Sequence, residues 1–97
     1  MNTVKKQIAE IIRKRRIELN MTQAQVSELL GYNSCQFFSM VERGLAKCPI
    51  QTLGSLSVIL NIPKERFISI LVTDYKDHLW DSLNAGSKMV KVPSKAG

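Results

Sequence analysis

The chain has 97 residues, of which 44% are hydrophobic and only 6% aromatic, and its 14 Lys and Arg against 8 Asp and Glu give a net charge of +6. This length holds one mostly aliphatic core, and the apolar fraction is too high for a disordered chain. The basic balance favours a polyanionic partner, either nucleic acid or an anionic membrane surface, although net charge can also serve solubility alone. No apolar run approaches the ~20 residues of a membrane span, so we expect no membrane partner.

The titratable residues predict neither a metal site nor an enzyme. Cys35 and Cys48 do not have metal-binding spacing, and His78 is the only histidine. A polar N-terminus with Lys5 and Lys6 does not resemble a signal peptide, which predicts a cytoplasmic protein with two free thiols. Because no acid–base pair, activated nucleophile or phosphate loop is evident, we expect no catalytic residue, no cofactor and no metal.

The first helix is predicted over about residues 4–19. Its apolar residues recur at helical spacing and form one face: Val4, Ile8, Ile11 and Ile12. Asn20 is suited to the helix end because asparagine tolerates the left-handed conformation there.

The second helix has both a start and a stop signal. Thr22 followed by Gln25 forms a Thr-x-x-Gln capping box, in which each side chain accepts a hydrogen bond from a free backbone donor of the first turn. Gly31 can end the helix because a positive φ costs glycine little. The polar segment 32–34 then predicts a tight turn.

A third helix is predicted over about residues 35–43, with Ser34 as its N-cap and Gly44 after its end. Phe38 and Val41 are three residues apart and should point into the core. Residues 45–49 are then predicted to form a loop that ends at Pro49.

A fourth helix is predicted to about residue 60, with Asn61 as its C-cap, and Pro63 fits the first turn of a fifth helix. The run 67–72 is apolar nearly all round and rich in β-branched residues, so a short strand stays open there. The segment 74–83 indicates a sixth helix. Residues 84–97 hold two glycines, a proline and three lysines, which predicts a mobile basic tail.

The predicted helices 23–30 and 35–43 are both short, and a tight turn that begins with a glycine joins them. This arrangement is typical of a helix-turn-helix. Such a unit places its second helix in the major groove of DNA. That helix needs an apolar face to dock on the protein and an outer face of short polar or adaptable groups, and residues 34–43 offer both.

From about residue 8 to residue 67 the chain resembles the phage repressor and Cro-like (XRE) family of helix-turn-helix domains. The residues that carry the resemblance are Arg16, Met21-Thr22-Gln23, Val26-Ser27-Glu28-Leu29-Leu30-Gly31, Phe38-Ser39-Met40-Val41-Glu42-Arg43-Gly44, Pro49, Thr52-Leu53 and Leu60-Asn61-Ile62-Pro63. One additional residue between Gly31 and Glu42 predicts a longer turn around Tyr32 and Asn33.

The resemblance implies an all-α, five-helix repressor-like bundle that binds operator DNA as a two-fold dimer. We therefore expect a DNA-binding domain over residues 1–72, a C-terminal extension over 73–83 with a sixth helix or short strand, and the tail over 84–97.

The resemblance also implies roles for single residues. Arg16 and Glu42 should form a partly buried ion pair, the alternative being two solvated surface charges. Cys35, Gln36 and Met40 align with base-reading positions, and the Gln36 carboxamide can pair bidentately with adenine.

Other polar residues nearby are expected to contact DNA less specifically. Asn33 and Ser34 can reach bases or phosphates, and Ser34 can equally be only a cap. The residues expected at the DNA backbone are Thr22, Gln23, Ser39, Arg43, Lys47 and Arg13, and such contacts supply position and salt-dependent affinity.

Tyr75, Leu79, Trp80 and Leu83 lie beyond the five-helix domain. They either cover the core of their own chain or form a two-fold interface, and we favour dimerisation. The predicted function is a sequence-specific transcriptional regulator, most simply a repressor, that binds an inverted-repeat operator as a homodimer. The alternative is the antitoxin of a toxin–antitoxin pair or a regulator that acts by binding another protein.

Overall fold

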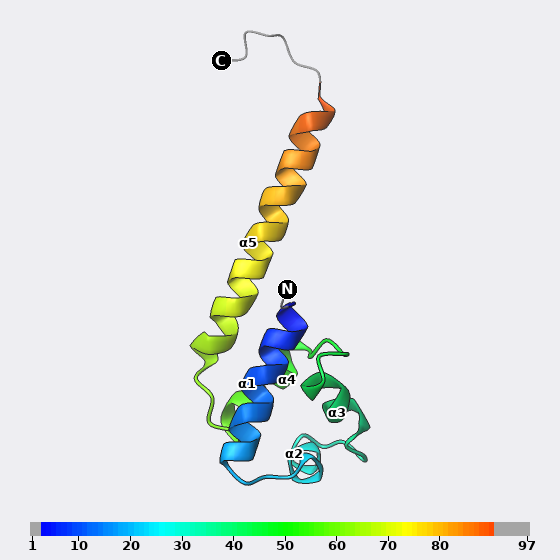
Figure 1. Cartoon of the computed structure of the whole chain (residues 1–97), viewed down its shortest axis with the longest axis vertical. Helices are drawn as coiled ribbons and strands as arrows, with labels where there is room; N and C mark the ends of the chain where they lie inside the picture. The colour runs from blue at the N-terminus through cyan, green and yellow to red at the C-terminus, as the bar shows by residue number, and fades with distance from the viewer. Residues whose placement is uncertain (1–2, 91–97) are drawn as a thin grey trace.

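The structure is a computed structural model that describes residues 3–90. It contains α1 (Val4–Glu18), α2 (Gln23–Leu29), α3 (Gln36–Glu42), α4 (Ile50–Ile59) and α5 (Lys64–Met89), and no strand within the described range (Figure 1). The predicted all-α fold is confirmed, and the strand considered for residues 67–72 is wrong because those residues lie in α5.

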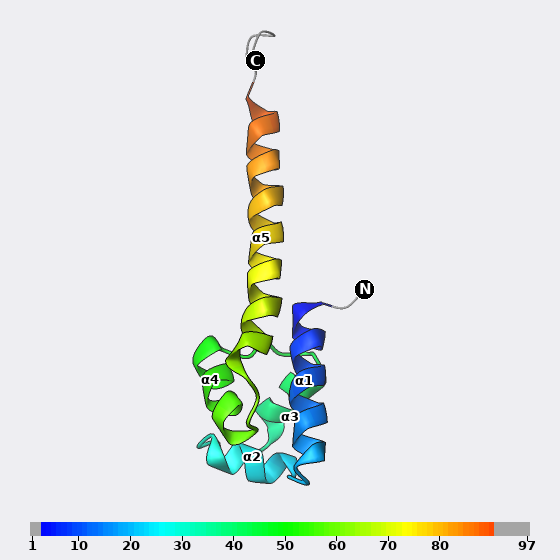
Figure 2. The same ribbon diagram turned by 90° about the vertical axis from the view of Figure 1, so that its left-hand side faces the viewer.

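Helices α1 to α4 and the start of α5 form a bundle, and the rest of α5 projects from it (Figures 1 and 2). The chain is accordingly elongated, with principal extents of 62, 24 and 23 Å. Helix α3 packs against both α1 and α2, and α5 packs against α1 and α4. Helix α3 is therefore held against both α1 and α2.

The core takes at least one buried side chain from every helix, and its aliphatic character matches the low aromatic content. Buried hydrophobic residues are Ile8, Ala9, Ile12, Val26, Phe38, Val41, Cys48, Leu53, Leu56, Leu60, Ile62 and Phe67. Phe67 is the one residue of α5 that is fully in this core, so it anchors the projecting helix to the bundle.

The predicted start of α2 and the predicted ends of α1, α2 and α4 are confirmed, with Leu60 rather than Asn61 as the C-cap of α4. Asn20 (φ 57°) and Asn61 (φ 53°) adopt the left-handed conformation after α1 and α4, and Gly31 does so (φ 86°) after α2. In the capping box, the Gln25 N–H donates to Thr22 Oγ1 at 3.0 Å and the Thr22 N–H donates to Gln25 Oε1 at 2.8 Å.

The C-terminal predictions need correction. In place of a fifth and a sixth helix, α5 is one helix of 26 residues that continues through 74–83. Residues 84–89 belong to it as well, so the tail predicted from residue 84 starts too early, and its part at 91–97 lies outside the described residues. No proline interrupts residues 64–92, and a single interior glycine such as Gly86 costs a helix only about 1 kcal/mol.

Candidate nucleic-acid interface

The connection between α2 and α3 covers residues 30–35. Gly31 N–H donates to Glu28 O and Tyr32 N–H to Ser27 O, both at 2.9 Å, which satisfies the carbonyls at the end of α2. The Tyr32 ring then contacts the Phe37 ring edge-on, with centroids 5.5 Å apart and an interplanar angle of 69°. The aromatic pair thus links the turn to the first turn of α3.

The start of α3 differs from the prediction by one residue. Cys35, not Ser34, is the N-cap, and the cap makes no side-chain hydrogen bond. Ser34 lies in the turn, where its Oγ accepts a hydrogen bond from the Gln36 N–H at 3.4 Å. Both Ser34 and Asn33 are exposed.

Helix α3 has two distinct sides. Phe38, Val41 and Glu42 are buried against the bundle. Gln36, Met40 and Arg43 follow at intervals of four and three residues, which places them together on the opposite side, and all three are exposed. Ser39 and Cys35 lie at the margins of this side and are half-buried. Gln36 and Met40, two of the residues expected to read bases, therefore share one outward surface with Arg43, which was expected at the DNA backbone.

A buried ion pair holds the C-terminal end of α3. The Arg16 guanidinium donates from Nε to Glu42 Oε2 and from Nη2 to Glu42 Oε1 at 2.9 Å, so the pair expected from the resemblance is present and bidentate. The Glu42 side chain is 1% exposed and that of Arg16 13%. Arg16 Nη1 also donates to the Met21 carbonyl at 2.8 Å, which ties the loop before α2 to the same point. The hydrogen bond to Glu42 raises the pKa of Arg16.

Gln23 completes this cluster. Its Nε2 donates to Glu42 Oε1 at 2.9 Å, which uses one of its two amide N–H groups, and the side chain is half-buried. Thr22 is exposed, and its hydroxyl oxygen accepts a hydrogen bond as the cap of α2. Arg16, Gln23 and Glu42, which we call the clamp, therefore join α1, α2 and α3 at one point.

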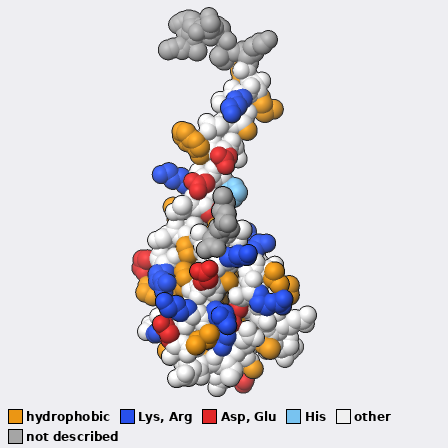
Figure 3. Space-filling model, in the orientation of Figure 1, with side chains coloured by type: hydrophobic (Ala, Val, Ile, Leu, Met, Phe, Trp, Pro, Cys, Tyr) orange, Lys and Arg blue, Asp and Glu red, His pale blue; other side chains and the backbone are white. Residues whose placement is uncertain are grey.

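The three basic residues expected at the DNA backbone are all exposed: Arg13 on α1, Arg43 at the end of α3 and Lys47 in the following loop. Residues 1–60 carry eight basic against four acidic residues, whereas residues 61–90 carry four of each. Lys and Arg side chains accordingly spread over the globular part of the molecule in Figure 3. The excess positive charge thus belongs to the bundle and not to the projecting helix.

The four residues proposed for dimerisation do not cover the core of their own chain. Tyr75, Leu79, Trp80 and Leu83 are all exposed along the part of α5 that leaves the bundle. These four side chains therefore add nothing to the core of their own chain.

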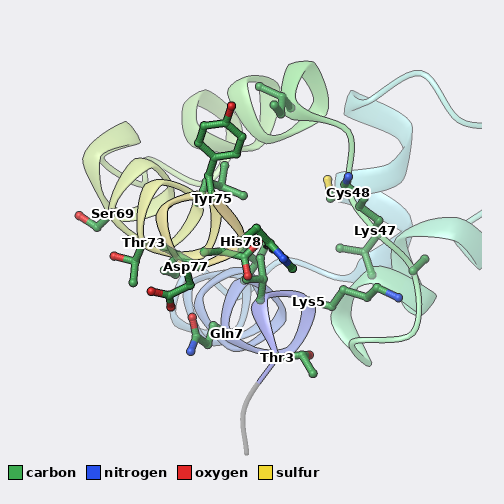
Figure 4. A pocket seen from close by; sticks show the side chains of 18 residues that line it. Thr3, Lys5, Gln7, Lys47, Cys48, Ser69, Thr73, Tyr75, Asp77 and His78 are labelled. Atoms are coloured by element: carbon green, nitrogen blue, oxygen red, sulfur yellow. Dashed lines mark ion pairs between the residues drawn. The ribbon is translucent and has the colours of Figure 1, made fainter. Parts of the chain in front are cut away.

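An open groove, which sequence reasoning did not anticipate, lies between the N-terminal half of α1, the loop after α3 and the middle of α5. Its volume is about 1070 Å³. Figure 4 shows Lys5, Lys47, Cys48, Tyr75 and His78 around it. Because these segments are distant in the sequence, only the packing of α5 on α1 brings them together.

The groove holds neither a metal site nor a reactive thiol. Burial raises the pKa of the Cys48 thiol to about 11, which keeps it protonated. No group of three metal-ligating side chains occurs within residues 3–90.

The chain matches no family model, no curated protein and no solved structure. In the part of the chain that the structure describes, no helix is both long and apolar enough to cross a membrane. The function must therefore be argued from residue pattern and geometry.

Proposed function

We propose that the chain is a cytoplasmic, sequence-specific regulator that binds double-stranded DNA through a helix-turn-helix like that of the phage repressor and Cro family, with α3 as the recognition helix. The observation that carries this proposal is the two-sided character of α3. Its inner side is fixed by core residues and by the clamp, while Gln36, Met40 and Arg43 share an exposed outer side.

These three side chains suit different parts of a DNA duplex. Gln36 lies in the first turn of α3, where a recognition helix meets base edges, and its amide can pair bidentately with adenine for about 1–3 kcal/mol of discrimination. Met40 can contact a thymine methyl group, and Arg43 can bind a phosphate. Cys35, Ser34 and Asn33 surround the same first turn and add contacts of lower specificity.

Binding to the DNA backbone would come from the exposed cations of the bundle. Arg13, Arg43 and Lys47 can each neutralise a phosphate, and the excess positive charge of residues 1–60 supports a polyanionic partner. Gln23 serves this surface indirectly, because it braces the clamp and thereby the end of α3.

We further propose a homodimer that recognises an inverted repeat, with repression as the regulatory outcome. The exposed apolar residues of the projecting helix support a second copy as partner, since single-chain proteins rarely expose a row of large apolar side chains. A two-fold dimer places two recognition helices about 34 Å apart, one turn of DNA.

The same exposed helix supports a second candidate function, in which α5 binds a different protein, as in an antitoxin. In that case the purified chain alone would stay monomeric, and its α5 would gain protection from hydrogen exchange only with the partner present. Self-association of the purified chain without any partner favours the homodimeric regulator.

Selection of bound sequences from a random duplex pool tests the proposal. We expect enriched sequences with two inverted half-sites whose centres lie about 10–10.5 base pairs apart. Binding should weaken steeply with added salt, since counterions are released from phosphates. Recovery of unselected sequences with the same salt dependence would show non-specific binding only and would contradict the proposal.

A further inference from the structure

The projecting part of α5 carries a continuous apolar stripe. Its members are Ile68, Val72, Tyr75, Leu79, Leu83, Gly86 and Val90. The six that have side chains are all exposed, from 44% for Leu79 to 68% for Leu83. At 100° per residue these positions fall within about 80° of the helix circumference, so they form one narrow face.

The spacing of this stripe is symmetrical about Leu79. Counting outward from Leu79, the intervals are four, three and four residues toward the N-terminus and four, three and four toward the C-terminus. A two-fold axis that crosses a pair of antiparallel helices at Leu79 would therefore place every stripe position opposite another stripe position. A parallel pair does not require this symmetry.

We propose that α5 pairs in antiparallel orientation with α5 of a second copy around a two-fold axis at Leu79. This rests on the homodimer of the proposed function and defines its geometry. Leu79 faces its counterpart in the second copy, Tyr75 faces Leu83, Val72 faces Gly86 and Ile68 faces Val90. Gly86 has no atom near the place of a Cβ in the single chain, so it leaves room for the valine opposite.

The charges of α5 fit such a pair. The stripe itself contains no charged residue. Asp74, Asp77 and Asp81 lie roughly 140–160° around the helix from its centre, on the far side, so their carboxylates do not oppose one another across the seam. The seam therefore buries no like charges.

The apolar area is sufficient for a dimer. Tyr75 and Trp80, which borders the stripe, each carry on the order of 150–250 Å² of side-chain surface and are about two-thirds exposed. With the aliphatic members, the exposed area approaches the ~800 Å² per partner of a standard interface. Tyr75 also lines the groove beside α1, so the second α5 would lie along the open side of that groove.

Cysteine cross-linking of the full chain, without DNA, tests orientation and register. In a background with Cys35→Ser and Cys48→Ala, the variants Tyr75→Cys and Leu83→Cys are mixed and oxidised, and Leu79→Cys is oxidised alone. We expect a covalent dimer from the mixture and from Leu79→Cys, but none from Tyr75→Cys or Leu83→Cys alone. In those cases like residues are offset by about 12 Å along the pair, beyond disulfide reach.

Self-linking of Tyr75→Cys would indicate a parallel pair and overturn the proposal, as would the absence of any cross-link. Sedimentation equilibrium of Leu79→Arg in the native background supplies a second test, with Asn84→Arg on the far side as a control of equal charge change. We expect Leu79→Arg to weaken self-association about 100-fold or more and Asn84→Arg to leave it unchanged.

Failure of this proposal can be separated from failure of DNA recognition. A monomeric Leu79→Arg protein should still select a single half-site sequence. A wild-type chain that selects half-sites but never self-associates would overturn the α5 pair and leave the recognition helix standing. A chain that pairs through α5 but selects no sequence would overturn DNA recognition by α3 and leave the α5 pair standing.

Discussion

Among single substitutions of charged residues, we expect removal of Arg16 to destabilise the fold most. The Glu42 carboxylate is 1% exposed and accepts two hydrogen bonds from Arg16 and one from Gln23. In Arg16→Ala only the Gln23 amide would remain, and a buried carboxylate would lose its countercharge. Breaking a buried pair in this way costs about 3–5 kcal/mol.

Urea unfolding followed by circular dichroism at 222 nm measures this loss, at one fixed protein concentration because a dimer makes stability depend on concentration. Trp80 fluorescence is unsuitable, because this side chain is exposed on the projecting helix. Arg13→Ala, an exposed arginine on the same helix, should change stability by less than about 0.5 kcal/mol. A loss below about 1 kcal/mol in Arg16→Ala would refute the role of the clamp.

The double variant Arg16→Met/Glu42→Leu separates the cost of an unpaired charge from the value of the pair. Because both charges are removed together, we expect its stability to lie near that of the wild type. Since the hydrogen bond to Glu42 raises the pKa of Arg16 above its ordinary value, the stabilisation from the arginine charge is fully present from neutral to moderately alkaline pH and is lost only as pH rises through the raised pKa. A marked fall in the contribution of Arg16 between neutral pH and pH 10 would contradict this interpretation.

Three further changes have defined outcomes. Thr22→Ala removes the cap of α2 and should cost about 1 kcal/mol in the same urea assay, and a neutral result would contradict the capping box. Gly31→Ala should lower the free energy of unfolding by about 1–2 kcal/mol, because an alanine is strained at the positive φ of this residue. Gly44→Ala should lower it further, because the new Cβ would also lie 2.9 Å from Lys6 Cγ. Equal losses in the two variants would argue against a contact between residue 44 and Lys6. Because its pKa is raised to about 11, the Cys48 thiol should react with an alkylating reagent about 100-fold more slowly at pH 8 than a thiol of pKa 9.0. The free energy of unfolding should fall as pH rises from 9 to 11, because the thiol ionises in the unfolded chain before it ionises in the folded one. Rapid labelling, followed by mass spectrometry, would contradict the burial of Cys48.

Local signals in the sequence predicted the bundle well. The capping box at Thr22 and the left-handed residues Asn20, Gly31 and Asn61 act within a few residues of chain, so their effect can be derived without tertiary information. Burial of Phe38 and Val41 followed from helical spacing for the same reason.

The start of α3 and the length of α5 were harder to predict. Capping preference favoured Ser34, but Cys35 occupies the cap position without a side-chain hydrogen bond, so the helix start does not follow from capping preference alone. In α5 the β-branched run and the polar residues near its end suggested separate elements, whereas nothing in residues 64–89 terminates a helix.

The clamp was predicted only in part. The Arg16–Glu42 pair came from the family resemblance, because no local rule links residues 26 positions apart. The resemblance placed its third member, Gln23, at the DNA backbone, and the packing of α2 against α3 also brings its amide to Glu42 on the recognition helix. The groove beside α5 depends in the same way on tertiary packing.

The most direct test of DNA recognition by α3 is position-resolved selection from a random duplex pool with the wild type and with Gln36→Ala, and with Lys47→Ala as a matched control for backbone binding. We expect Gln36→Ala to lose preference at one or two positions of each half-site, for about 1–3 kcal/mol at those positions, while the rest of the site is retained. Lys47→Ala should weaken binding to all sequences equally and reduce its salt dependence. A uniform loss of affinity in Gln36→Ala, with the sequence preference unchanged, would contradict base reading by this helix.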